Sequence, residues 1–271
     1  RCIPSLVKPL YDLAQPYDCI VDEADIGVWS ADYLKSGFAV EDVWTTGVWA
    51  NADIGDVCSP GSFTDFGGDV FEILASGFDI WGTSDEFHYV YKPLSGDGQI
   101  TVRVESILPD PPLNQWTKAG VMIRDTLDPN SAHAFMAVTP NYNPDGTGPF
   151  GHRLSAQGRL TAGDSSFNVD AGNMTGPQCI RIMRQGDTFT TYYYYDGEWI
   201  ELASTDIVMT DPVYIGMAVT AHEDSGPLAT AKFDRVCSNT FLPTDTYSDF
   251  LINLKDYSLI ASKYLDELLW P

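Results

Sequence analysis

Apolar and polar residues alternate in several short stretches of the central part of the chain. The clearest stretch is residues 99–107, where aliphatic side chains at Ile100, Val102 and Val104 are separated by polar ones. A period of two residues predicts a strand with one buried face. Residues 87–91 form a second predicted strand, and the glycine-containing turn at residues 95–98 between them predicts a hairpin.

The remainder of this region predicts further short strands separated by turn signals. A hairpin is expected around Gly186, and a second turn is expected at Gly158. Residues 139–150 are rich in Pro, Gly and Asn and predict a loop. The other predicted strands are residues 153–157, 159–162, 180–184, 188–195, 199–203, 213–221 and 230–236. Such a succession is typical of an antiparallel β-sandwich, so we expect a mainly β fold.

The pattern changes at both ends of the chain. Apolar residues at helical spacing predict a short helix at residues 25–34. A segment near the C-terminus matches this one without gaps, so that Asp25 falls on Asp256 and Asp22 on Asn253. We therefore divide the chain into an N-terminal segment (1–41), a β-sandwich (42–240) and a C-terminal segment (241–271).

The repeated segments resemble the loop–helix halves of dockerin-type calcium modules, whose loops supply oxygen ligands at fixed positions. The resemblance implies a calcium site in each copy. Tyr247, Ala14 and Pro16 stand where that pattern expects ligands. The implied C-terminal ligands are Asp245, Asp249, Asn253, Asp256 and the Leu251 carbonyl; the N-terminal ones are Asp18, Asp22, Asp25 and the Ile20 carbonyl. Alternatively, these polar residues only cap the helices that follow them.

The two halves are separated by the entire sandwich, which leaves two arrangements open. They pair within one molecule, or the C-terminal half of one molecule pairs with the N-terminal half of the next. The second arrangement is head-to-tail and generates a filament unless it closes into a ring.

The central region resembles the laminin-G-like or concanavalin-like jelly-roll domains of bacterial secreted and cell-surface proteins. Four sequence stretches, in this order, are the basis of the resemblance: DIWGTSDEFHYVY, LSGDGQITVRVESI, WTKAGVMIRDTL and ATAKFDRV. It implies a jelly-roll sandwich with a structural calcium ligand at Asp234. Enzymes, lectins and spacers share this fold, so it does not choose among them.

The composition narrows the class of partner. The net charge is −23, with 38 acidic and 15 basic residues, which disfavours nucleic acid and anionic membrane surfaces. No apolar run has the length of a membrane-spanning helix. The chain begins at Arg1 without a leader-like pattern, so we interpret it as a processed, secreted protein.

Five cysteines favour an oxidising compartment. In the expected fold, Cys58 and Cys237 lie near the first and last strands, which suggests one disulfide. Cys2 and Cys19 form a second candidate pair. Cys179 is then left as a buried free thiol. Spacing alone leaves the connectivity open.

Catalytic patterns are missing from the sequence, whereas candidate sugar contacts are present. We find no alternately spaced carboxylate pair, nucleophile elbow or metal-binding helix motif, and expect no enzyme. Polar and aromatic residues on predicted strands form a candidate glycan surface. They are His88, Trp116, Arg124, His133, Arg153, Tyr192, Tyr194 and Trp199. In the alternative interpretation, they are packing residues and members of buried polar networks.

These observations favour a non-catalytic structural or interaction protein of the cell surface or extracellular matrix. We expect it to self-assemble, or to bind another surface protein, through calcium-stabilised ends. The alternative is a carbohydrate-binding module that serves polysaccharide capture or degradation.

Overall fold

A computed structural model describes residues 49–109, 114–140, 151–175, 177–223 and 226–240. Nearly all of them belong to one compact unit, Gly47–Ser238. The dockerin-like segments, every calcium ligand predicted in them, and the candidate pair Cys2 and Cys19 lie outside the described residues.

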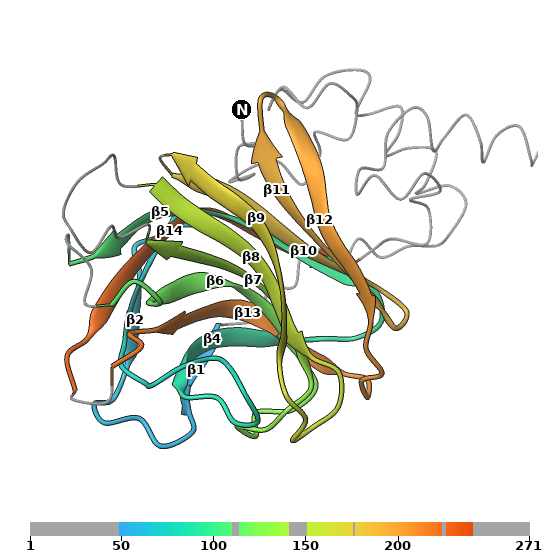
Figure 1. Ribbon diagram of the computed structural model, residues 1–271, viewed down its shortest axis with the longest axis horizontal. Helices are drawn as coiled ribbons and strands as arrows, with labels where there is room; N and C mark the ends of the chain where they lie inside the picture. Colours follow the sequence, from blue (N-terminus) through green and yellow to red (C-terminus); the bar gives the residue numbers. More distant parts are fainter. Residues whose placement is uncertain (1–48, 110–113, 141–150, 176, 224–225, 241–271) are drawn as a thin grey trace, which may run out of the picture. The chain divides into compact units, whose positions relative to one another are not determined.

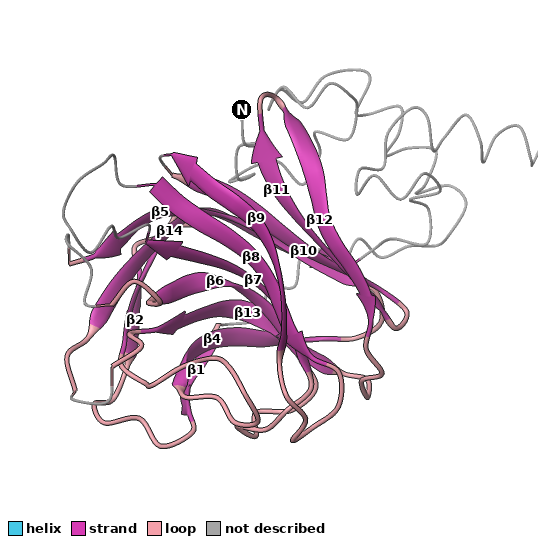
Figure 2. Ribbon diagram, viewed as in Figure 1, coloured by secondary structure: helices cyan, strands magenta, loops and turns pink. Residues whose placement is uncertain are grey.

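The described residues form two antiparallel sheets of seven strands each (Figures 1 and 2). The strands are β1 (Ala50–Ile54), β2 (Ser62–Asp65), β3 (Phe71–Ala75), β4 (Phe87–Leu94), β5 (Gly98–Leu108), β6 (Lys118–Arg124), β7 (His133–Pro140), β8 (Gly151–Arg159), β9 (Phe167–Thr175), β10 (Gln178–Gln185), β11 (Thr188–Tyr195), β12 (Glu198–Asp206), β13 (Val213–Thr220) and β14 (Ala229–Thr240). Sheet A has the order β1-β4-β13-β6-β7-β8-β9, and sheet B has the order β12-β11-β10-β5-β14-β3-β2. The predicted mainly β sandwich is confirmed. No helix occurs among the described residues, and therefore none long and apolar enough to cross a membrane.

The main core lies between the two sheets and follows the alternation seen in the sequence. Ile100, Val102 and Val104 of β5 are fully buried and share one hydrophobic cluster with Val121 and Ile123 of β6. The predicted strand at residues 99–107 is therefore confirmed, with its apolar face on the core. Burial of this face is the dominant favourable contribution to folding.

The predicted hairpin between residues 87–91 and 99–107 is wrong. β4 pairs with β1 and β13 in sheet A, whereas β5 pairs with β10 in sheet B. Gly96 has a φ of 69° and donates its N–H to Asp211 (2.7 Å), so the turn crosses from one sheet to the other. Turn residues allow the chain to reverse, but they do not decide whether the flanking strands pair.

The predicted turn at Gly158 is also wrong, because β8 runs through it without a break. A Cβ atom at this position would lie 2.6 Å from the backbone oxygen of His133. Glycine therefore permits a close approach of two strands here, which is its other common use in sheets. The hairpin predicted around Gly186 is confirmed by the pairing of β10 with β11.

The outer face of sheet A carries a second hydrophobic layer. Met122, Phe135 and Ala137 point away from the main core and form a separate cluster that includes Ile80. Ile80 lies in the connection between β3 and β4, so this connection packs over the outer face of the sheet. The packing fixes the neighbouring residue, Trp81, above the strands.

Candidate functional site

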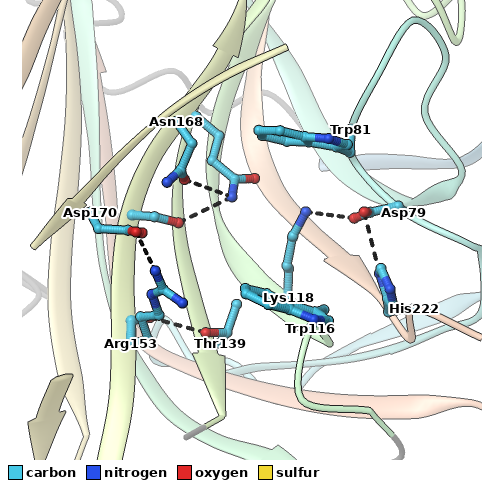
Figure 3. Close-up of a pocket in the computed structure, with 11 residues that line it drawn as sticks. Asp79, Trp81, Trp116, Lys118, Thr139, Arg153, Asn168, Asp170 and His222 are labelled. Atoms are coloured by element: carbon cyan, nitrogen blue, oxygen red, sulfur yellow. Dashed lines mark hydrogen bonds and ion pairs between the residues drawn. The ribbon is translucent and has the colours of Figure 1, made fainter. Parts of the chain in front are cut away.

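A pocket of about 420 Å³ opens on the outer face of sheet A, beside the β3–β4 connection (Figure 3). Its lining combines two tryptophans with charged, amide and hydroxyl side chains. The lining residues are Asp79, Trp81, Trp116, Lys118, Thr139, Arg153, Ser155, Gln157, Asn168, Asp170 and His222.

Strand register assembles the polar floor of the pocket. Ser155 of β8 is paired with Asp170 of β9, and Gln157 is paired with Asn168. Directly paired residues share a face of a sheet, and Arg153 joins them two positions before Ser155. Gln157 Nε2 donates to Ser155 Oγ (3.2 Å) and to Asn168 Oδ1 (3.1 Å). These bonds fix the floor before any ligand arrives.

Two tryptophans from separate connections supply the apolar surface. Trp81 and Trp116 each keep 40% of their surface exposed, although buried aromatic area is strongly stabilising. Figure 3 shows the indole ring of Trp81 above that of Trp116, with the Lys118 amino group between them. Lys118 Nζ lies 5.5 Å from the ring centroid of Trp81, and Arg153 Cζ lies 5.4 Å from that of Trp116.

Asp79 links two basic side chains of the pocket. Lys118 Nζ donates to Asp79 Oδ1 (2.5 Å) and to the Ile80 carbonyl (3.0 Å), and His222 Nδ1 lies 3.3 Å from Asp79 Oδ2. Burial alone would raise the pKa of Asp79, but His222 and Lys118 outweigh it and the pKa falls below 3.8. Burial lowers the pKa of Lys118, and Asp79 partly offsets this. The contacts with His222 and Lys118 therefore favour the ionised form of Asp79.

Asp170 forms the second ion pair of the pocket, with Arg153. Partial burial would raise the pKa of Asp170, but hydrogen bonds with Asn168 and Arg153, together with the Arg153 charge, lower it below 3.8. Each cation of the lining thus has its own carboxylate.

A buried ionic network holds the connection that carries Trp81. Arg159 donates from Nη2 to Asp85 Oδ1 (2.7 Å) and from Nη1 to Asp85 Oδ2 (3.0 Å), and also binds the Gly82 carbonyl. Arg124 and His133 lie 3.6 Å from the same carboxylate. All four ionisable side chains are fully buried. The network joins the connection to the ends of three strands.

The structure brings together two of the predicted glycan residues, Trp116 and Arg153, in the pocket. Arg124 and His133 are excluded from solvent by the network around Asp85. Burial lowers the pKa of His133 to about 4, so the ring is neutral at pH 7. His88 is buried as well and lies 2.7 Å from Asp53. These three residues follow the alternative interpretation, in which strand Arg and His side chains form internal networks.

The other predicted glycan residues lie in sheet B. Tyr193 packs on the core, so its neighbours Tyr192 and Tyr194 face outward on β11. Trp199 of β12 makes an edge contact with Tyr194 at 5.4 Å and is covered by Arg181 at 4.1 Å. These aromatics form a surface that is separate from the pocket.

The sequence interpretation missed most of the lining. Asp79 and Trp81 lie within the stretch DIWGTSDEFHYVY but outside any predicted strand. Lys118 resembles an ordinary exposed lysine, and Asp170 sits in a segment for which no strand is predicted. The one available signal was the tryptophan in a glycine-containing connection, because exposed connections commonly carry binding residues.

Asp234, predicted as a calcium ligand, has another role in the described structure. Both of its carboxylate oxygens accept hydrogen bonds from Arg103, with Nε at 2.6 Å from Oδ1. No group of three or more His, Cys, Asp or Glu side chains suited to a metal occurs within the described ranges.

The predicted disulfide between Cys58 and Cys237 is wrong, because Cys237 is a free thiol. The prediction assumed that the last strand lies beside the first, whereas β14 lies between β5 and β3. Cys179, expected to be a free thiol, is disulfide-bonded.

No protein-family model and no curated protein matches this sequence. Among solved structures, it is similar to a functionally unknown protein from Saccharomyces cerevisiae, with a TM-score of 0.50 and 14% identity over 67% of this chain and 97% of that chain. The carbohydrate-binding module CBM66 from Bacillus subtilis has a TM-score of 0.44 and 12% identity over 70% of this chain and 95% of that one. The GH43 protein BlXynB from Bacillus licheniformis has a TM-score of 0.45 and 13% identity over 64% of this chain and 33% of that one. At such identities a likeness concerns the fold, and the function has to be argued from the pocket.

Proposed function

We propose that this chain is a non-catalytic carbohydrate-binding domain and that the pocket on sheet A holds the sugar. The observation that carries the proposal is the pairing of two half-exposed tryptophans with a preformed ring of polar groups. The aliphatic faces of sugar rings stack on indoles, and their hydroxyls take up hydrogen bonds from nearby donors and acceptors. The volume of about 420 Å³ lies within the range of small-molecule sites.

The protonation states of the pocket support binding without hydrolysis. A glycoside hydrolase uses two carboxyl groups, one of which has a raised pKa and serves as the acid. The pocket has two carboxylates, Asp79 and Asp170, and the pKa of each is lowered by basic or amide neighbours. Neither is suited to donate a proton at neutral pH.

The predicted self-assembly depends on residues 1–41 and 241–271 and stays a prediction, as do the calcium sites of those segments. The secreted or cell-surface location has the same status. We favour sugar binding because its determinants lie within the described residues.

Calorimetric titration of the full chain with a panel of mono- and oligosaccharides tests the proposal. We expect binding of at least one neutral sugar and its weakening in Trp81→Ala and Trp116→Ala. Trp199→Ala is the matched control, because it removes a tryptophan from the other sheet. Binding that disappears in Trp199→Ala and survives both pocket variants would refute the proposed site. Release of reducing ends from a bound oligosaccharide would refute the non-catalytic assignment.

A further inference from the structure

We infer that the pocket selects uncharged sugars and rejects those that carry a carboxylate or sulfate. This inference rests on the proposed function and specifies its ligand class. It follows from the way in which the charges of the lining are paired.

The cations of the lining are Lys118 and Arg153, and His222 is a further basic side chain. Lys118 is bound to Asp79 and to a backbone carbonyl, and Arg153 is bound to Asp170. His222 faces the second oxygen of Asp79. Asp79 and Asp170 therefore pair with Lys118 and Arg153, and among the described lining residues neither of these basic side chains is left over for an anionic ligand.

An acidic sugar would have to displace Asp79 or Asp170 from its partner. Displaced Asp79, whose side chain is 14% exposed, would remain largely desolvated without its counter-ion, which is unfavourable. The more exposed Arg153–Asp170 pair contributes less to this penalty. The net charge of −23 adds a general repulsion that is screened at physiological salt. The ion pairs within the pocket are therefore the main reason why it discriminates against acidic sugars.

Gln157 shows what the pocket accepts instead. Its side chain is only 7% exposed, and its Oε1 atom has no hydrogen-bond partner among the described residues. A buried acceptor without a partner costs free energy. A sugar hydroxyl can donate to this oxygen, whereas a carboxylate or sulfate group cannot. The ionised carboxylates of the two ion pairs offer further acceptors for hydroxyls.

The test compares sugar pairs that differ only in oxidation at C6. Methyl glucoside and methyl galactoside are titrated against the corresponding methyl uronides, with the full chain and by calorimetry or ligand-observed NMR. We expect the preferred neutral sugar to bind at least about tenfold more tightly than its uronide. Asp170→Asn releases Arg153, so we expect this variant to reduce the ratio by gaining affinity for the uronide.

Glu198→Gln is the matched control, because it makes the same charge change on an exposed residue of sheet B. It should leave the ratio unchanged. Equal or tighter binding of the uronide by the unmodified chain would overturn the inference and leave the proposed function standing. A ratio that Asp170→Asn does not alter would also overturn it. Failure of every sugar of the panel, including both members of each pair, to bind would refute the proposed function itself.

Discussion

The buried carboxylate of Asp85 provides the sharpest test of how the sandwich is held together. We consider Asp85→Asn, which preserves the shape of the side chain and removes its charge. Asp85 is fully buried and accepts two hydrogen bonds from Arg159, at 2.7 and 3.0 Å. Arg124, also fully buried, lies 3.6 Å away. After the substitution, two guanidinium groups would remain inside the protein without a counter-ion.

Removing one partner of a buried ion pair costs about 3–5 kcal/mol, because the remaining charge stays desolvated. Asp170→Asn breaks an ion pair of the same composition in which the Arg153 and Asp170 side chains are 38% and 35% exposed. Exposed pairs contribute about 0.2–1 kcal/mol. The same chemical change should therefore destabilise the protein several times more at Asp85 than at Asp170.

Urea denaturation, followed by tryptophan fluorescence, measures the change in the free energy of unfolding for Asp85→Asn and for Asp170→Asn. Thermal unfolding provides a second measurement. For a domain of this size, about 3–5 kcal/mol corresponds to a fall in Tm of roughly 6–20 °C. The control is the slope of the urea transition, which should stay constant if only stability has changed. A loss at Asp85 below about 1 kcal/mol, or one equal to that at Asp170, would contradict the assigned role of the network.

Three further predictions concern binding, pH and thiol reactivity. Trp81→Ala and Trp116→Ala should each weaken sugar binding about tenfold. A sugar ring that covers roughly 50 Å² of exposed indole gains about 1.3 kcal/mol of binding free energy. The control variant, Trp199→Ala, should change the dissociation constant less than twofold. Burial lowers the pKa of His133 from 6.5 to about 4, so between these pH values the unfolded chain binds a proton that the folded chain does not. The free energy of unfolding should therefore decrease by up to about 3 kcal/mol as the pH falls through this window. His133→Asn should flatten this part of the pH profile measured by urea denaturation. Burial and the nearby carboxylate of Asp69 raise the pKa of the Cys237 thiol from 9.0 to about 11. Alkylation of Cys237 at pH 8, measured by mass spectrometry, should therefore be about 100-fold slower in the folded protein than in urea. Comparable rates in the two states would contradict a raised pKa of this thiol.

The fold class could be predicted from the sequence because strand periodicity is a local property. Alternation at Ile100, Val102 and Val104 gave both the strand and its buried face. Pairing between strands is not local. The turn at Gly96 and the glycine at Gly158 have the composition of hairpin turns, yet one crosses between sheets and the other lies inside a strand. In both cases the neighbours in space, not in sequence, decide the role of the glycine.

The site was harder to predict because its lining comes from parts of the chain that periodicity does not relate. Trp116 and Arg153 were selected as a tryptophan and a cation near strands. The same reasoning selected Arg124 and His133, which the structure buries. Local sequence cannot separate an exposed polar contact from a buried one, because the difference depends on a distant carboxylate, that of Asp85.

The buried network that includes Arg124 and His133 nevertheless influences the pocket, because its member Arg159 holds the connection that carries Trp81. Arg159 binds both Asp85 and the Gly82 carbonyl, which lies one residue after Trp81. Ser166 Oγ donates to the same carbonyl (3.0 Å). A rigid aromatic loses little conformational entropy on binding, so fixing this indole in advance favours affinity. Weakening the network should therefore lower sugar affinity under conditions in which the chain is still folded, and it should do so without touching any group of the lining. The test compares the sugar affinity of folded Asp85→Asn with that of a core variant of equal stability, such as Ile182→Ala. If only Asp85→Asn loses affinity, the network positions Trp81, and a general loss of stability is not the cause.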